Sequence, residues 1–203
     1  MRLSETDEIA AELYLVPPAR FVAARDQVAR QARAAGHREL ARELQALRRP
    51  ALSAWLVNAL ARHRRERLRE LFALGRDLRQ AQTRLDAESL RRLPGRREEL
   101  VAELLGWARE HAAELGVRTT EAAVAEVEAT LRAGLVDLGA SAAVLSGQLA
   151  RPMAHAGFGP LPQVESVGGP AGREPRLAED AADGWVAWPV EDELTRRRQR
   201  STG

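Results

Sequence analysis

Five arginines within eight residues form the densest group of chemically capable side chains in this sequence. They are Arg62, Arg64, Arg65, Arg67 and Arg69. On a single helix Arg62, Arg65 and Arg69 share one face, and Arg76 extends it. Such a ridge can bind the phosphates of a nucleic acid. Because no DNA-binding module or aromatic platform accompanies the arginines, we favour the alternative of a solvated face paired with an acidic helix predicted over 98–115.

Two histidines each precede a glutamate by three residues, in His63–Glu66 and His111–Glu114. Metal sites in helical bundles use Glu-x-x-His together with carboxylates from facing helices. Here the order is reversed, and inward-facing carboxylates on other helices are not evident. We therefore predict no metal site and expect these histidines at the edge of the core.

Motifs for catalysis are absent from the chain. The sequence has no Gly-x-Ser-x-Gly, Walker or Gly-x-Gly-x-x-Gly pattern, and the lack of cysteine excludes thiol chemistry and cysteine-based zinc sites. We therefore predict no catalytic residue and no cofactor. Helical bundles can carry enzyme sites without a local motif, so this favours a non-enzymatic protein without excluding an enzyme.

One asparagine interrupts the apolar stretch "LRRPALSAWLVNALAR" at 47–62. Trp55, Asn58 and Arg62 lie on one side of the predicted helix. If Asn58 is buried, it needs hydrogen bonds to a neighbouring helix end or loop, and it then fixes how the helices dock. The alternative is an exposed patch in which these three residues bind a partner. We favour the buried asparagine.

Apolar residues recur at helical spacing through the first 150 residues, which predicts an all-α multi-helix bundle. A long central helix is predicted over 51–85. Asp86 can cap a short helix that ends near Pro94, and another helix is predicted over 96–115. The domain of 1–150 is thus expected to consist of helices joined by short loops.

Charge changes sign along the predicted helices. Residues 51–97 have a net charge of +7 and residues 98–150 a net charge of −6, within a total of +2. Sequential helices in a bundle with short loops are antiparallel neighbours, so the two stretches are expected to pair. All 31 basic residues are arginine, a usage that we attribute to codon bias rather than to a partner.

Residues 151–203 differ in composition from the helical part. They hold six of the ten prolines and seven of the fifteen glycines, which predicts a flexible tail. Within it, Trp185 and Trp188 lie among acidic residues in "EDAADGWVAWPVEDEL" at 179–194. We expect this segment to dock on a basic surface, in cis or in trans.

Three stretches carry a resemblance: "LYLVPPARFVAARDQVARQARAAG", "LRRPALSAWLVNALAR" and "EVEATLRAGL". With them, residues 10–150 resemble a family of uncharacterised helical proteins from actinobacteria. The resemblance implies a helical, cytoplasmic protein. It supplies no activity, ligand or functional residue.

The sequence favours a non-enzymatic interaction or regulatory protein that binds a protein partner through helix surfaces and the C-terminal segment. The alternative is an arginine-driven nucleic-acid-binding protein. No signal peptide is visible, and the longest nearly apolar run, 50–61, is too short to cross a bilayer. We therefore expect a soluble cytoplasmic protein without membrane contact, and a homo-oligomer is compatible with the sequence.

Overall fold

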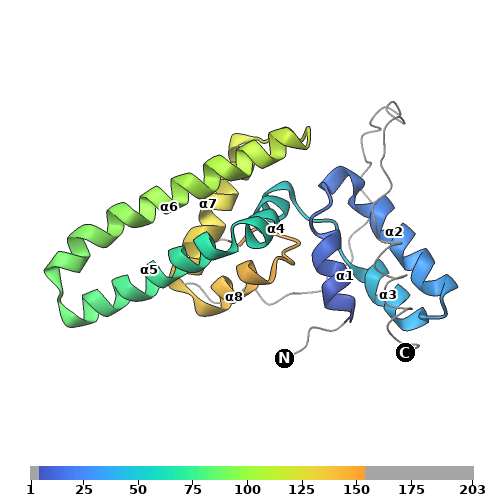
Figure 1. Cartoon of the computed structure of the whole chain (residues 1–203), viewed down its shortest axis with the longest axis horizontal. Helices are drawn as coiled ribbons and strands as arrows, with labels where there is room; N and C mark the ends of the chain where they lie inside the picture. Colours follow the sequence, from blue (N-terminus) through green and yellow to red (C-terminus); the bar gives the residue numbers. More distant parts are fainter. Residues whose placement is uncertain (1–4, 154–203) are drawn as a thin grey trace, which may run out of the picture. The chain divides into compact units, whose positions relative to one another are not determined.

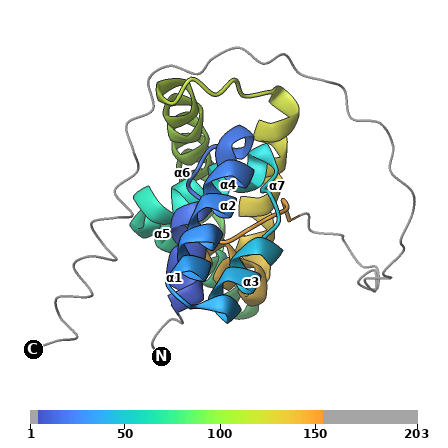
Figure 2. The ribbon, with the colours of Figure 1, turned by 90° about the vertical axis from the view of Figure 1, so that its right-hand side faces the viewer.

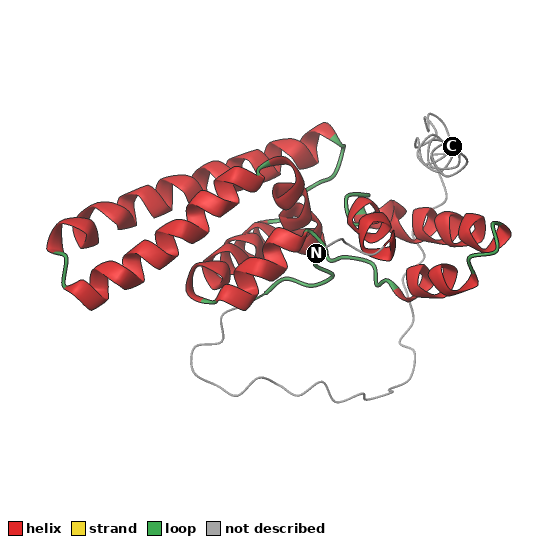
Figure 3. Ribbon diagram, turned by 60° about the horizontal axis from the view of Figure 1, so that its bottom comes forward, coloured by secondary structure: helices red, strands yellow, loops and turns green. Residues whose placement is uncertain are grey.

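The computed structural model describes residues 5–153, and every regular element in this range is an α-helix (Figure 1; Figure 3). The all-α bundle prediction is therefore confirmed. The predicted tail, apart from residues 151–153, and Trp185 and Trp188 lie outside the described residues. The helices are α1 (Glu5–Leu13), α2 (Pro18–Ala34), α3 (Arg38–Ala46), α4 (Leu52–His63), α5 (Arg65–Arg84), α6 (Ala87–Glu114), α7 (Glu121–Val136) and α8 (Leu138–Ser146).

Helices α1, α2 and α3 pack around an apolar cluster of their own, and Figure 2 shows them side by side. Pro18 occupies the first turn of α2, where its missing N–H costs no helical hydrogen bond. Tyr14 and Phe21 stack with ring centroids 5.4 Å apart across the turn between α1 and α2. Gly36, with φ +88°, then reverses the chain so that α3 can pack on α2.

Helix α4 is the buried centre of a second group formed with α5–α8. Nine of its residues, from Ser53 to Ala61, are buried, which is typical of a helix that is apolar on all sides. The prediction of one helix over 51–85 is wrong, because the helix is interrupted at Arg64, with φ −126° and ψ 30°. No proline or glycine marks the interruption. The chain changes direction where α4 leaves the enclosed core and the partly exposed α5 begins.

Helix α6 is one helix where the sequence predicted two, whereas the predicted central helix is divided into two. The sequence predicted separate helices before Pro94 and over 96–115, whereas α6 is continuous from Ala87 to Glu114 with Pro94 inside it. A proline removes one hydrogen bond from a helix interior and clashes with the preceding turn. Packing against α5 offsets this cost: Leu93 and Leu100 are buried on either side of the proline, and Arg96 binds Glu70 of α5 at 2.6 Å.

Two glycines set the approach of α5 to α7. A Cβ atom on Gly75 would overlap the backbone carbonyl of Leu135, and one on Gly134 would lie 2.5 Å from the Phe72 ring. Only residues without a side chain therefore allow the two helices to pack at this distance. Arg79 of α5 also donates a hydrogen bond to the Leu135 carbonyl oxygen, at the end of α7.

Residues 147–153 follow α8 as a non-helical segment with a turn and bends, which we call the strap. Its backbone is held by buried groups from two helices. The Leu149 N–H donates to Asn58 Oδ1 and the Leu149 carbonyl accepts from Asn58 Nδ2, at 2.8 and 2.9 Å. The Met153 N–H donates to Thr130 Oγ1 at 2.9 Å. Leu149 and Ala150 pack against the second and first apolar clusters respectively, so the strap joins both.

Candidate functional site at the α4–α5 junction

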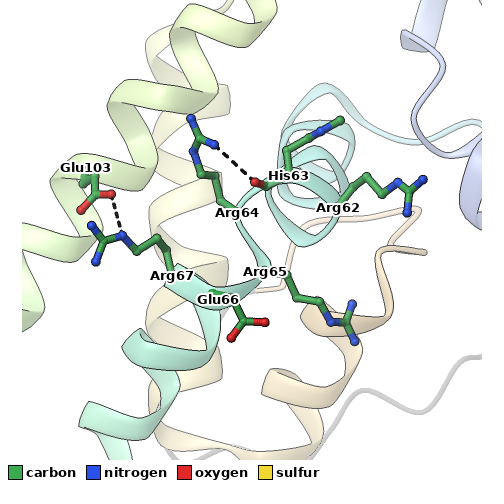
Figure 4. A pocket seen from close by; sticks show the side chains of 7 residues that line it. All are labelled: Arg62, His63, Arg64, Arg65, Glu66, Arg67 and Glu103. Carbon is green, nitrogen blue, oxygen red and sulfur yellow. Dashed lines mark hydrogen bonds and ion pairs between the residues drawn. The ribbon is translucent and has the colours of Figure 1, made fainter.

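An open pocket of about 570 Å³ lies where α4 ends and α5 begins (Figure 4). Its position follows from the interruption at Arg64, which places successive side chains around a bend instead of along one helix. We call the pocket lining together with Trp107 of α6 the junction surface. The lining residues are Arg62, His63, Arg64, Arg65, Glu66, Arg67 and Glu103.

The guanidinium groups of the junction surface point in different directions (Figure 4). Arg62 forms an ion pair with Glu12 of α1 at 3.4 Å. Arg65 donates to the carbonyl of Leu145 in the last turn of α8 at 2.8 Å, where a cation is favourable to the helix dipole. Arg67 binds Glu103 of α6 at 3.0 Å and Glu70 at 2.9 Å. Each of these three arginines thus has a hydrogen-bonding or ion-pair partner within the protein.

Arg64 has an aromatic partner. Its guanidinium carbon lies 4.9 Å from the centroid of the half-buried Trp107 ring, which is a cation–π contact. The other rings of the group stack in the same place: Trp107 and His111 are nearly parallel with centroids 4.7 Å apart, and His63 lies 5.8 Å from Trp107. This group joins the end of α4 to α6.

The two histidines of this group are disposed to stay neutral. Burial, reinforced by the nearby Arg62 and Arg64 charges, lowers the pKa of His63 below its ordinary value. Burial also lowers the pKa of His111, and the His63 ring, 5.3 Å away, acts in the same direction. Neutral imidazoles can stack on indole without adding charge to a surface that already carries four arginines.

The four arginines predicted as contact residues do not form one ridge. Arg62 lies on α4, whereas Arg65, Arg69 and Arg76 lie on α5 beyond the bend. Arg69 pairs with Glu66 at 2.5 Å. Arg76 is exposed and makes no hydrogen bond or ion pair among the described residues. The expectation of a shared face assumed an unbroken helix, which the structure does not have.

Pairing between the basic and acidic stretches is present but incomplete. Arg67 reaches Glu103 on α6, as the charge pattern predicted. The ion pair of Arg96 with Glu70 lies within the basic stretch itself. Arg62 and Arg65 instead find their partners on α1 and α8. The arginines of the basic stretch therefore bind several elements, and the acidic stretch is only one of them.

Asn58 is buried, as the favoured interpretation of the sequence predicted. Its side chain is 0% exposed and forms the two hydrogen bonds with Leu149 of the strap. Trp55 is also 0% exposed, and its indole N–H donates to the carbonyl of Leu15 at 2.9 Å. Trp55 and Asn58 therefore belong to the core, and of the three residues only Arg62 is exposed.

Sequence reasoning missed the role of Trp107. This residue packs against the core from α6, but its contact with Arg64 joins residues far apart in the sequence. The one available signal was the pair of histidines expected at the core edge, since both lie beside this tryptophan.

Within residues 5–153, no group of three or more histidine and acidic side chains could hold a metal ion. None of the helices in this part of the chain is long and apolar enough to cross a membrane. Comparison of the chain with family models, curated proteins and solved structures gave no match. Its function must therefore be argued from the junction surface itself.

Proposed function

We propose that this chain is a non-enzymatic interaction protein of the cytoplasm, which presents the junction surface to an acidic segment of a protein partner. The C-terminal segment around Trp185 and Trp188 is its second docking element. The observation that carries the proposal is the contact between Arg64 and Trp107 beside an open, arginine-lined pocket.

The residue types at the junction surface support a protein partner. Tryptophan and arginine are the residues most often found to dominate the binding energy of protein interfaces, especially where they line a pocket. Trp107 is half-buried, so it presents part of its ring while the rest is fixed by His111. Its orientation is set before binding, which lowers the entropy cost of forming a complex.

The charges of the pocket specify the partner's chemistry. Four arginines line it against two glutamates, Glu66 and Glu103. A partner segment that combines carboxylates with one apolar side chain would satisfy both the guanidinium groups and the indole. The anchored arginines favour this over a nucleic acid at the same place, because their guanidinium groups do not form a continuous row.

A defined probe tests the junction surface. A labelled synthetic peptide with the sequence of residues 179–194 combines acidic residues with Trp185 and Trp188. We expect it to bind the full-length protein, and we expect Arg64→Ala or Trp107→Ala to weaken binding about tenfold or more. Arg84→Ala, which removes an exposed arginine at the far end of α5, is the matched control.

Affinity capture from the native cytoplasm extends the test to real partners. A protein retained by the wild type and by Arg84→Ala, but lost with Arg64→Ala, supports the proposal. Loss with Trp185→Ala and Trp188→Ala would assign the C-terminal segment. If neither the peptide nor any captured protein distinguishes Arg64→Ala from Arg84→Ala, with both variants folded, the junction surface has no part in binding.

A further inference from the structure

Helices α2 and α3 concentrate positive charge. Residues 18–49 contain eight arginines and three acidic residues, a formal net charge of +5, whereas the segment before them is acidic. This basic region is separate in sequence from the junction surface. It did not stand out in the sequence because the first 50 residues together have a net charge of only +2.

Most of these arginines have no carboxylate partner among the described residues. Arg30, Arg38, Arg48 and Arg49 are exposed and make no ion pair or hydrogen bond there through their side chains. Arg33 donates only to the neutral Gln45 side chain, at 2.9 Å. This differs from the junction surface, where Arg62 and Arg67 are held by carboxylates and Arg65 by a backbone carbonyl.

The helical spacing gathers these donors on one side. Arg38, Arg42 and Gln45 follow at i, i+4 and i+7 along α3 and are exposed, while the small Ala41 at i+3 is buried beside them. The hydrogen bond from Arg33 to Gln45 joins the end of α2 to this row, and Arg30 lies one turn earlier on α2. Figure 2 shows the two helices side by side. We call Arg30, Arg33, Arg38, Arg42 and Gln45, with the following Arg48 and Arg49, the α2–α3 basic face.

One ion pair on this face is weak. Arg42 binds Glu39 at 3.1 Å, but the two side chains are 73% and 81% exposed. An exposed pair of this kind contributes little, roughly 0–1 kcal/mol, so Arg42 can exchange Glu39 for a stronger anion. The face therefore offers six guanidinium groups to a ligand.

We propose that the α2–α3 basic face binds the phosphodiester backbone of a nucleic acid. Rows of arginine on an exposed helix neutralise successive phosphates and release their counterions. The residues of this face include no aromatic or large apolar side chain, which membrane-binding helices require. Its donors contact phosphate, so the binding is independent of base sequence.

Salt-dependent binding of the full-length protein tests this proposal. The probes are a labelled duplex DNA of about 25 base pairs and a labelled single-stranded RNA of about 25 nucleotides, each long enough to cover the face. The protein is titrated into each probe, and binding is followed by fluorescence anisotropy from low to physiological salt. We expect binding at low salt whose affinity falls linearly with the logarithm of the salt concentration. The two probes show whether a duplex or a single strand fits the face better.

Two triple variants of equal charge locate the site. Arg30→Gln with Arg38→Gln and Arg49→Gln removes three unpaired donors of the face, and we expect the salt slope to fall by about 2–3 and the affinity at low salt about tenfold or more. The control, Arg84→Gln with Arg91→Gln and Arg92→Gln, removes three exposed arginines around the α5–α6 turn. It should change the affinity less than about threefold.

Each other outcome overturns the proposal. Absence of binding to both probes at low salt excludes a nucleic-acid site. An equal loss in the two triple variants, both shown to be folded by circular dichroism, means that net charge alone drives binding. Binding to phosphatidylserine vesicles without binding to either nucleic acid assigns the face to a membrane surface instead.

Discussion

Asn58 shows what one polar side chain contributes inside an apolar helix. Its amide both donates to and accepts from the backbone of Leu149, so every strong hydrogen-bonding group of that side chain faces a partner of opposite character. A carboxylate or a methyl group cannot reproduce this arrangement. The residue therefore helps to determine which segment covers α4, a role that the purely aliphatic residues around it cannot have.

The first prediction concerns this amide. Asn58→Asp places a carboxylate oxygen where Nδ2 donates to the Leu149 carbonyl, at a site that is 0% exposed. We expect a loss of about 3 kcal/mol in the free energy of unfolding, measured with urea. Gln80→Glu, the same change of amide to acid on an exposed position of α5, should have little effect. An unchanged urea midpoint for Asn58→Asp would contradict the buried role.

At the scale of elements, the crossing of α5 and α7 depends on two glycines, and the break between α4 and α5 depends on burial. Both features arise from tertiary contact. Gly75 and Gly134 lie in ordinary helical sequence, and Arg64 has no helix-breaking neighbour. Each of the three is distinguished by what it packs against or adjoins. Gly75 faces the backbone of α7 and Gly134 faces the Phe72 ring, whereas Arg64 follows the end of the enclosed core.

A pair of glycine substitutions tests the crossing. Gly75→Ala forces its Cβ into the Leu135 carbonyl, so we expect a loss of about 1–3 kcal/mol in the free energy of unfolding. Gly106→Ala in α6 meets nothing within 4 Å and should instead stabilise the protein by about 0.5–1 kcal/mol. Thermal melting of the two variants gives the comparison. Equal effects would mean that α5 and α7 do not pack as described.

Composition and periodicity predicted that the elements are helices but not where two of them begin and end. Leu100 and Leu104 are buried in α6, which agrees with a helix in this region, because burial of one face leaves a periodic pattern. Pro94 misled the prediction, since local propensity favours a helix end there and packing against α5 overrides it. The junction surface could not be predicted, because its histidine, arginine and tryptophan come together only through the fold.

At the scale of the whole described unit, opposite charges and the stacked rings of His63, Trp107 and His111 connect α6 to the helices that precede it. The ion pairs of Arg67 and Arg96 connect α5 with α6, and hydrogen bonds from Arg96 and Arg67 lower the pKa of Glu70. These pairs are at least partly exposed, so each one contributes little stability. They select the pairing of the helices, while the apolar clusters supply most of the stabilisation.

Acid should weaken the contact between α4 and α6. The pKa values of His63 and His111 are lowered in the folded protein, so the unfolded chain takes up protons first as the pH falls. Stability is therefore fully present above about pH 6.5 and is lost as the pH decreases below it. We expect a lower urea midpoint at about pH 5.5 than at about pH 7.5. Glu12 and Glu114 oppose the shifts only in part.

The double variant His63→Gln with His111→Gln is the control for this pH dependence. It leaves His37 and His155 in place, so a flatter stability profile assigns the effect to the junction histidines. A profile with the same slope as that of the wild type would show that other groups are responsible.

Truncation tests the strap. A chain that ends at Ser146 loses the partners of Asn58 and Thr130 and the Ala150 carbonyl that accepts from the Ala51 N–H, so buried polar groups are left without hydrogen bonds. We expect a loss of about 3 kcal/mol or more, measured by thermal and urea unfolding. A chain that ends at Met153 keeps all of these bonds and should melt like the full-length protein. Equal melting temperatures of the two truncated chains would show that the strap does not stabilise the fold.

The strap also sets the order of events during synthesis. Asn58 and Leu149 are 91 residues apart, so the amide leaves the ribosome long before its partner exists. At about 5–20 residues per second, the interval is roughly 5–20 s, during which α4 lacks the hydrogen bonds to Leu149 and the helices that enclose it are synthesised one after another. The chain that emerges in this interval carries a mostly apolar segment, Ser53–Ala61, that stays in water or on a chaperone until it is enclosed. Completion of this fold therefore waits for translation, and a pause before residue 149 would prolong the stage at which the nascent chain is most prone to aggregate.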